Sequence, residues 1–240
     1  MIQKLSQGIF DLNLEHNGMH PVLIWSEQDG ATLIDTGMPG SLEVIQESVR
    51  EAGVAWNDIR RIILTHQDID HIGSLPAIVA SLPSKPEIWA HSGDADVIEG
   101  KAPFLKMGAD RIATMPEPMR QALEQLSVDL KDIRITRLLE DGEQLPVGGG
   151  LRVIYTPGHT PGHICLYVPE EELLLAADQL IVKDGLLTGP NEAFTPDMPL
   201  AIKSMSKLTS LAIRRVLCYH GGVYDQQPEE AIEKLAHASN

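Results

Sequence analysis

The chain has 240 residues, of which 43% are hydrophobic, enough for the buried core of one large α/β domain. Its 19 basic and 34 acidic residues give a formal net charge of −15, which argues against nucleic acid or an anionic membrane as a partner. The start lacks the apolar region of a signal peptide and no apolar run approaches the length of a membrane span, so we expect a cytoplasmic protein. Two cysteines are too few for a disulfide framework, and we expect both thiols to be buried and reduced.

The first 55 residues read as short strands followed by one helix. Strands are predicted at 9–14, 22–25 and 31–35, separated by turn signals, which indicates an antiparallel meander. A helix is expected from Ser41 to about Glu51. Asp35 closes the third strand and has two interpretations: a carboxylate that orients a metal ligand or the following loop, or an Asx turn made by its own side chain.

The stretch from Ile62 to Gly73 carries the clearest chemical signal. A strand at 59–64, which ends in the apolar run Ile62-Ile63-Leu64, leads to His66, Asp68, Asp70 and His71. A helix is expected from about Gly73 to Ser81. Two imidazoles and two carboxylates converging at a strand end would repel or lie unpaired without a cation. Because α/β sheets usually place their chemistry at the carboxyl ends of strands, the pattern predicts a metal site.

The next segment is predicted to be a short strand followed by a helical insertion. The strand at 87–90 leads to His91, for which a structural role is favoured over one in the site. Residues 93–130 combine methionines and leucines with prolines and are expected to be helical. Their apolar face has three interpretations: a lid over the substrate, a contact between two copies of the chain, or simple packing on the sheet.

The second half returns to strands that end in potential ligands. Strands are expected at 133–138, 151–156, 164–168, 173–177 and 215–218, with an irregular loop at 186–194 and a helix from Thr195 to about Leu208. A rigid double Pro-Gly turn holds His159 and His163 in a fixed relation. Asp178 and His220 each follow an apolar strand, and with His159 upstream a ligand role for Asp178 is favoured over a turn-forming one.

Five motifs in this order resemble those of the metallo-β-lactamase superfamily. They are Leu33-Ile34-Asp35-Thr36-Gly37, Thr65-His66-Gln67-Asp68-Ile69-Asp70-His71, Pro157-Gly158-His159-Thr160-Pro161-Gly162-His163, Asp178 and His220. The match covers roughly residues 30 to 222. The resemblance implies an αββα sandwich of two mixed sheets flanked by helices, formed by residues 1–240 as a single domain with the insertion at about 93–130.

The resemblance also implies a ligand set for two divalent ions, expected to be zinc. His66 and His159 would bind the first ion, Asp70, His71 and His220 the second, and Asp178 would bridge them. Asp70 would also orient the attacking hydroxide and take its proton, while Asp35 and His163 would support the ligands from behind.

One position departs from the superfamily pattern HxHxDH, because Asp68 stands where the second histidine is usual. A carboxylate is shorter and harder than an imidazole, so Asp68 could bind a shifted first ion, act through a water, or favour iron or manganese over zinc.

The expected activity is hydrolysis of a small ester, lactone or thioester by a metal-bridged hydroxide, in the manner of lactonases or glyoxalase II. About 20 residues follow His220, too few for the glutathione-binding domain of glyoxalase II, and Gln179-Leu180-Ile181 lacks the tyrosine of many acyl-homoserine lactonases. The partner is therefore a small molecule, with neither nucleic acid nor membrane involved. Two alternatives stay open: a di-iron oxidoreductase related to the flavodiiron proteins, suggested by Asp68, and a metal-binding module without catalytic activity.

Overall fold

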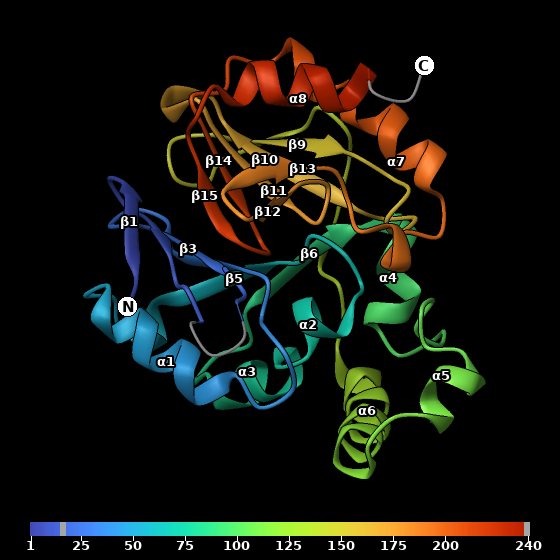
Figure 1. Cartoon of the computed structure of the whole chain (residues 1–240). Helices are drawn as coiled ribbons and strands as arrows, with labels where there is room; N and C mark the ends of the chain where they lie inside the picture. Colours follow the sequence, from blue (N-terminus) through green and yellow to red (C-terminus); the bar gives the residue numbers. More distant parts are fainter. Residues whose placement is uncertain (15–17, 238–240) are drawn as a thin grey trace.

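Two large β-sheets face each other and carry helices on their outer sides (Figure 1). This computed structural model describes residues 1–14 and 18–237. Helices α1 and α3 lie against the first sheet, while α7 and α8 cover the second. The αββα sandwich implied by the sequence motifs is therefore confirmed.

The first sheet changes from antiparallel to parallel pairing along its length. Its order is β1-β2-β3-β4-β5-β6-β7; the pairs up to β4 are antiparallel and those from β4 to β7 are parallel. The parallel part brings the carboxyl ends of β4, β5 and β6 to one edge, as expected for a sheet that carries a site there. The strands are β1 (Gln3–Ser6), β2 (Ile9–Asp11), β3 (Val22–Ser26), β4 (Gly30–Ile34), β5 (Ile59–Ile63), β6 (Glu87–His91) and β7 (Arg137–Leu139).

The second sheet has the order β15-β14-β11-β10-β9-β8 and is antiparallel except between β11 and β14. Because β11 and β14 are parallel neighbours, the residues that follow them emerge at the same edge. A separate hairpin pairs β12 with β13. The strands are β8 (Gln144–Leu145), β9 (Leu151–Tyr155), β10 (Ile164–Val168), β11 (Leu173–Ala177), β12 (Ile181–Lys183), β13 (Leu186–Thr188), β14 (Arg215–Cys218) and β15 (Gly222–Tyr224).

The helices are short and mostly amphipathic. In α1, for example, Ile45 and Val49 lie four residues apart and are fully buried against the first sheet. Helices α4 to α6 lie between residues 92 and 129, close to the insertion expected at 93–130, and α5 and α6 lie at the periphery of the molecule (Figure 1). The helices are α1 (Leu42–Glu51), α2 (Ile69–Ile72), α3 (Leu75–Ser81), α4 (Ser92–Ile98), α5 (Ala109–Ala113), α6 (Glu117–Asp129), α7 (Met198–Met205) and α8 (Pro228–His237).

The buried apolar residues form three clusters that correspond to the three interlayer spaces. One packs the first sheet against α1, α3 and α6, one lies between the sheets, and one packs the second sheet against α7 and α8. Strands β10 and β11 are buried along their whole length because a layer covers each of their faces. This rigid centre positions the loops that leave the strand ends.

Several local predictions differ from the structure. The strand expected at 9–14 ends with β2 at Asp11. The strand expected at 133–138 is reduced to β7, because the Ile135 amide donates to the Glu99 carboxylate (2.9 Å) and not to a neighbouring strand. The loop expected at 186–194 begins with β13 and ends in a 3₁₀ turn, Glu192–Phe194. The expected helix from 195 to 208 contains α7 only, which begins after Asp197.

Within residues 1–14 and 18–237, every helix is too short or too polar to cross a lipid bilayer. Cys165 and Cys218 are both buried and form no disulfide, as the sequence predicts. Treating residues 1–240 as one domain with an insertion at about 93–130 stays a prediction.

Candidate metal centre

Seven imidazole and carboxylate side chains converge beyond the carboxyl ends of four strands. Each follows a strand whose buried residues fix it in the core. The local sequence determines where each strand ends, and the order of the strands in the sheets brings these ends together. The loop after β5 provides four of them, the loop between β9 and β10 one, and the turns after β11 and β14 one each: His66, Asp68, Asp70, His71, His159, Asp178 and His220.

The four residues of the first motif are divided by the start of α2. Asp68 is the N-cap residue of α2 and has an extended conformation (φ −64°, ψ 147°). His66 therefore lies on the extended segment before the helix, whereas Asp70 and His71 lie in its first turn. Because the backbone changes conformation here, His66 and Asp68 point in a different direction from Asp70 and His71. The centre is therefore divided into two groups.

The first group, which we call the buried group, consists of His66, Asp68 and His159. Oδ2 of Asp68 lies 3.4 Å from Nε2 of His66 and 3.0 Å from Nε2 of His159. The side chains of His66 and His159 are 0% and 2% exposed. Asp178 reaches this group as well, with its Oδ2 3.3 Å from Nε2 of His159.

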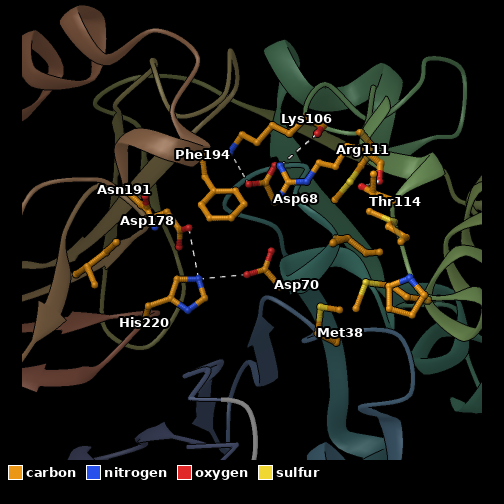
Figure 2. Close-up of a pocket in the computed structure, with 16 residues that line it drawn as sticks. Met38, Asp68, Asp70, Lys106, Arg111, Thr114, Asp178, Asn191, Phe194 and His220 are labelled. Carbon is orange, nitrogen blue, oxygen red and sulfur yellow. Dashed lines mark hydrogen bonds and ion pairs between the residues drawn. The ribbon is translucent and has the colours of Figure 1, made fainter. Parts of the chain in front are cut away.

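The second group, which we call the open group, consists of Asp70, His71 and His220. Nε2 of His220 lies 3.1 Å from Oδ2 of Asp70 and 3.5 Å from Oδ2 of Asp178. His71 is fully buried, with its Nε2 3.1 Å from Oδ1 of Asp178, but Asp70 and His220 are 24% and 33% exposed. Asp178 thus contacts both groups, as Figure 2 shows for His220.

The donor atoms at the centre fit a divalent cation. Among the described residues, three buried side-chain atoms here have no hydrogen-bond partner: Nε2 of His66, Nε2 of His71 and Oδ1 of Asp178. The last two are close but are not aligned for a hydrogen bond. Unpaired buried polar atoms are costly, and imidazole nitrogens with carboxylate oxygens are the ligands that zinc and similar ions take. His66, His71 and Asp178 are therefore arranged to hold metal.

Burial and charge shift the pKa values of several ligands. Burial alone would lower the pKa of His220, but its hydrogen bonds to Asp178 and Asp70 raise it to about 9. Burial would raise the pKa of Asp178, yet the charge of His71 and the hydrogen bond from His220 hold it well below its usual range. At neutral pH Asp178 is therefore an anion that accepts and does not donate.

Asp35 supports the open group from behind. Its carboxylate accepts hydrogen bonds from the Thr65 amide (2.8 Å) and the Thr65 hydroxyl (2.7 Å), and it lies 2.8 Å from Nδ1 of His71. Asp35 has a φ of 61°, a left-handed conformation that aspartate tolerates better than most residues. The contact to Nδ1 orients the His71 ring so that Nε2 points to Asp178. Asp35 thus orients the His71 ring, and the role of His71 as a metal ligand stays a prediction.

Asp94, at the start of α4, supports the loops of the buried group and was not predicted from the sequence. Its carboxylate accepts from the amide of Gln67 (3.0 Å), the hydroxyl of Thr160 (2.6 Å) and the amide of Gly162 (2.8 Å). It therefore ties the loop of the first motif to the loop that carries His159. A lone aspartate in a helical stretch offers no local signal for such a role.

His163 and Thr195 fix two further ligands. Nε2 of His163 accepts from the amide of Asp178 (3.2 Å), which places His163 behind that residue and not among the ligands. The hydroxyl of Thr195 lies 3.1 Å from Nδ1 of His159, so Nε2 of His159 faces the centre. Thr195 was not predicted. His91, in contrast, stacks on Tyr155 and accepts from the amide of Gly93, consistent with the structural role favoured for it.

Lys106 is the most unexpected neighbour of the centre. Its ammonium lies 2.5 Å from Oδ2 of Asp68 and 2.7 Å from Nε2 of His159 (Figure 2 shows the contact to Asp68). It comes from the segment between α4 and α5. A carboxylate at Asp68, where an imidazole is usual, is the one sequence feature that could have indicated a positively charged partner.

A cavity of about 610 Å³ opens above the centre (Figure 2). Asp70, Asp178 and His220 form part of its floor, and much of its wall comes from the segment 106–119 and from the loop before α7. Most of the wall is apolar, with the charged Arg111 stacked on Phe194, its guanidinium 4.6 Å from the ring centre. The apolar wall residues are Met38, Ile69, Met107, Met115, Pro116, Met119, Ile181 and Phe194.

Known proteins resemble this chain along most of its length. The family description "Metallo-beta-lactamase superfamily" matches residues 20–220. A Bacillus subtilis protein named probable metallo-hydrolase YflN is 29% identical over 227 residues, covering 90% of this chain and 84% of that protein. Hydroxyacylglutathione hydrolase GloC of Haemophilus influenzae is 28% identical over 160 residues, covering 66% of this chain and 65% of that protein.

Solved structures of the same fold superpose well. The metallo-beta-lactamase family protein TTHA1429 of Thermus thermophilus has a TM-score of 0.72 at 24% identity, covering 98% of this chain and 80% of that chain. A Cronobacter sakazakii metallo-beta-lactamase with a HARLDQ motif has a TM-score of 0.67 at 22% identity, covering 92% of this chain and 78% of that one. At these identities the likeness shows the fold.

Proposed function

This chain belongs to the metallo-beta-lactamase superfamily, and from that premise we propose that it hydrolyses a small ester, lactone or thioester with two divalent ions, preferably zinc. The observation that carries the proposal is the set of unpaired ligand atoms around Asp178, which lies at the floor of an apolar cavity. The name of the Haemophilus relative, a hydroxyacylglutathione hydrolase, supports an acyl substrate.

The residues would hold the ions in two groups that share one carboxylate. His66, Asp68 and His159 would bind one ion, Asp70, His71 and His220 the other, and Asp178 would contact both. When bound, such ions lower the pKa of water and polarise a substrate carbonyl. Side chains of the chain itself would accept the proton and bind the substrate.

Asp70 is the proposed proton acceptor. Its carboxylate lines the cavity and lies within 3.1 Å of His220. Burial would raise its pKa, but in the metal-free site the positive charge of His71 and the hydrogen bond from His220 lower it, so Asp70 is ionised there at neutral pH. An ionised carboxylate facing the substrate can orient a water molecule and take its proton.

The cavity wall would select the substrate. Met107, Met115 and Phe194 present flexible and aromatic apolar surface next to the ligands, which suits the hydrocarbon part of an acyl compound. The wall thus supports the lid interpretation of the 93–130 segment. We also propose that two copies pair through this segment, whose Met119 and Val128 are 44% and 57% exposed.

The test combines a metal assay with a substrate panel. The purified protein would be analysed for bound zinc, iron and manganese and assayed against an ester, a lactone, a thioester and a phosphodiester. We expect close to two equivalents of zinc after loading and turnover of at least one carbonyl substrate. Tight zinc without turnover of any of the four would contradict the proposal and favour a module that only binds metal.

A di-iron oxidoreductase is the alternative that Asp68 suggests. Carboxylate oxygen favours harder ions than imidazole does, and Asp68 lies within the buried group. Near two equivalents of iron in protein purified without added metal, with an absorption spectrum that changes on reduction, would favour this alternative. Zinc in the same preparation would exclude it.

A further inference from the structure

A lysine side chain occupies one side of the buried group. The ammonium of Lys106 lies between Oδ2 of Asp68 (2.5 Å) and Nε2 of His159 (2.7 Å), and its side chain is only 6% exposed. An ammonium has three protons to donate and accepts none, so each of these contacts uses a lone pair of Asp68 or His159. The same lone pairs are those with which the two residues would bind a metal ion.

Asp68 suits this lysine better than the usual histidine would. The superfamily pattern HxHxDH places a neutral imidazole there, which offers no negative charge to a buried ammonium. A carboxylate supplies the counter-charge, and a buried charge requires such a partner. The departure at Asp68 and the buried position of Lys106 are therefore explained together, as the two halves of one ion pair.

The open group has no such occupant. Among the described residues, the ion pairs of Asp70, His71 and His220 are formed with one another, with Asp35 and with Asp178. No lysine or arginine of residues 1–14 and 18–237 forms an ion pair with any of them. A cation arriving from solvent would meet only imidazoles and carboxylates in the open group, but an ammonium in the buried group.

The segment that carries Lys106 is attached to the first motif. The Leu105 amide donates to Oε1 of Gln67 (3.1 Å), and Gln67 is the residue between His66 and Asp68. Lys106 also lines the cavity, so its flexible side chain can turn into this space without movement of the attached backbone. The ammonium is thus held close to the buried group but is free to leave it.

We propose that Lys106 is a tethered cation that competes with metal for Asp68 and His159, so that the two groups load unequally. The first ion binds at Asp70, His71, His220 and Asp178. The second enters only when the ammonium of Lys106 turns out into the cavity. This inference rests on the proposed metal-dependent function and adds to it an order of loading and a residue that controls it.

The test is a metal titration of three proteins. Metal-free wild type, Lys106→Met and Lys101→Met would be titrated with Zn²⁺ against a chromophoric chelator and with Co²⁺ by visible absorption. Lys101 belongs to the same segment but is 56% exposed and pairs with Glu99, so its replacement removes the same charge away from the centre. Circular dichroism and the Tm of the metal-free proteins check that each variant folds.

We expect wild type and Lys101→Met to bind one ion tightly and a second at least about tenfold more weakly, the factor that corresponds to 1.4 kcal/mol of competition. In Lys106→Met the second ion should bind at least about tenfold more tightly than in wild type. Lys106→Gln, which keeps a hydrogen-bond donor without the charge, serves if the methionine variant does not fold, and the same strengthening is expected.

Equal affinities for the two ions in wild type, or a second affinity unchanged in Lys106→Met, would overturn the inference. Either result, together with zinc-dependent turnover of an acyl substrate, would leave the proposed function standing. Conversely, unequal loading with no turnover of any substrate would count against the proposed function alone. Failure of all three proteins to bind metal would contradict both this inference and the proposed function.

Discussion

The two ligand groups of the centre are built from the same kinds of side chain, yet they differ in what surrounds them. The buried group is largely shielded from solvent and contains the ammonium of Lys106. The open group is more exposed to the cavity and, among the described residues, forms its ion pairs only between imidazoles and carboxylates. Four of the residues in the two groups lie close together in the sequence, between positions 66 and 71. Ligands of the same residue type, close together in the sequence, can therefore have different surroundings in the folded chain.

Each group also has its own supporting carboxylate. Asp35 orients His71 in the open group, and Asp94 joins the two loops of the buried group. Asp178 is a carboxylate that contacts both groups. Variants at these positions can therefore separate the groups, or remove both together.

The largest effect is expected for Asp178→Ala. It removes a carboxylate that reaches both groups, so both ions should be lost and turnover should fall by about a thousandfold or more. Metal content and kcat measure this directly. Asp184→Asn, an exposed carboxylate in the turn of the β12–β13 hairpin, is the matched control and should change neither. Retention of both ions in Asp178→Ala would contradict a bridging role.

Asp35→Asn should weaken metal binding at the open group by about 10- to 100-fold, the usual effect of removing a carboxylate behind a histidine ligand. Asparagine also tolerates the left-handed conformation at this position, so the backbone should be preserved. Asp94→Asn removes the charge from the contacts to Gln67, Thr160 and Gly162, which lie next to residues of the buried group. It should affect the open group, where the first ion is proposed to bind, less than Asp35→Asn does. Titration with Co²⁺ distinguishes the two, and equal losses in both variants would argue against separate groups.

A smaller effect is expected for Phe194→Ala at the cavity wall. The substitution removes apolar surface above the open group and the ring on which Arg111 stacks. The KM for an acyl substrate should rise severalfold with little change in kcat, because the ring contacts bound substrate in the ground and transition states alike. Leu186→Ala, on the exposed β12–β13 hairpin, is the control. A fall in kcat at unchanged KM would place Phe194 closer to the chemistry than proposed.

The smallest effect concerns the stability of the metal-free protein. Hydrogen bonds to Asp178 and Asp70 overcome burial and raise the pKa of His220 from 6.5 to about 9. The protonated ring therefore stabilises the fold fully below pH 6.5, and this contribution is lost as the pH rises towards 9. The Tm of the metal-free protein should fall by a few degrees over that range. A His220→Gln variant should show a flatter dependence, and identical curves would contradict the assignment.

Most of the sandwich could be predicted because its strands carry the signal in their own residues. Strands β10 and β11 are apolar along their whole length, and β5 and β14 end in apolar residues. Each of the four strands is followed by a ligand, a turn or both. The segment 133–138 shows the limit of this reasoning. It has the composition of a strand, but a side chain from the end of α4, that of Glu99, takes one of its backbone hydrogen bonds, and no local pattern records that contact.

The sequence by itself determined the superfamily, the layered fold and the set of candidate ligands, because each ligand follows directly on a strand whose pattern is local. Only the tertiary structure decided how those ligands divide into two groups, that Asp94 joins two loops, and that Lys106 lies against Asp68. The cited contacts of Asp94 and of Lys106 with Asp68 join residues 27 to 68 positions apart. Spacing along a chain carries no information about such distant pairs, which are brought together only when the strands pack.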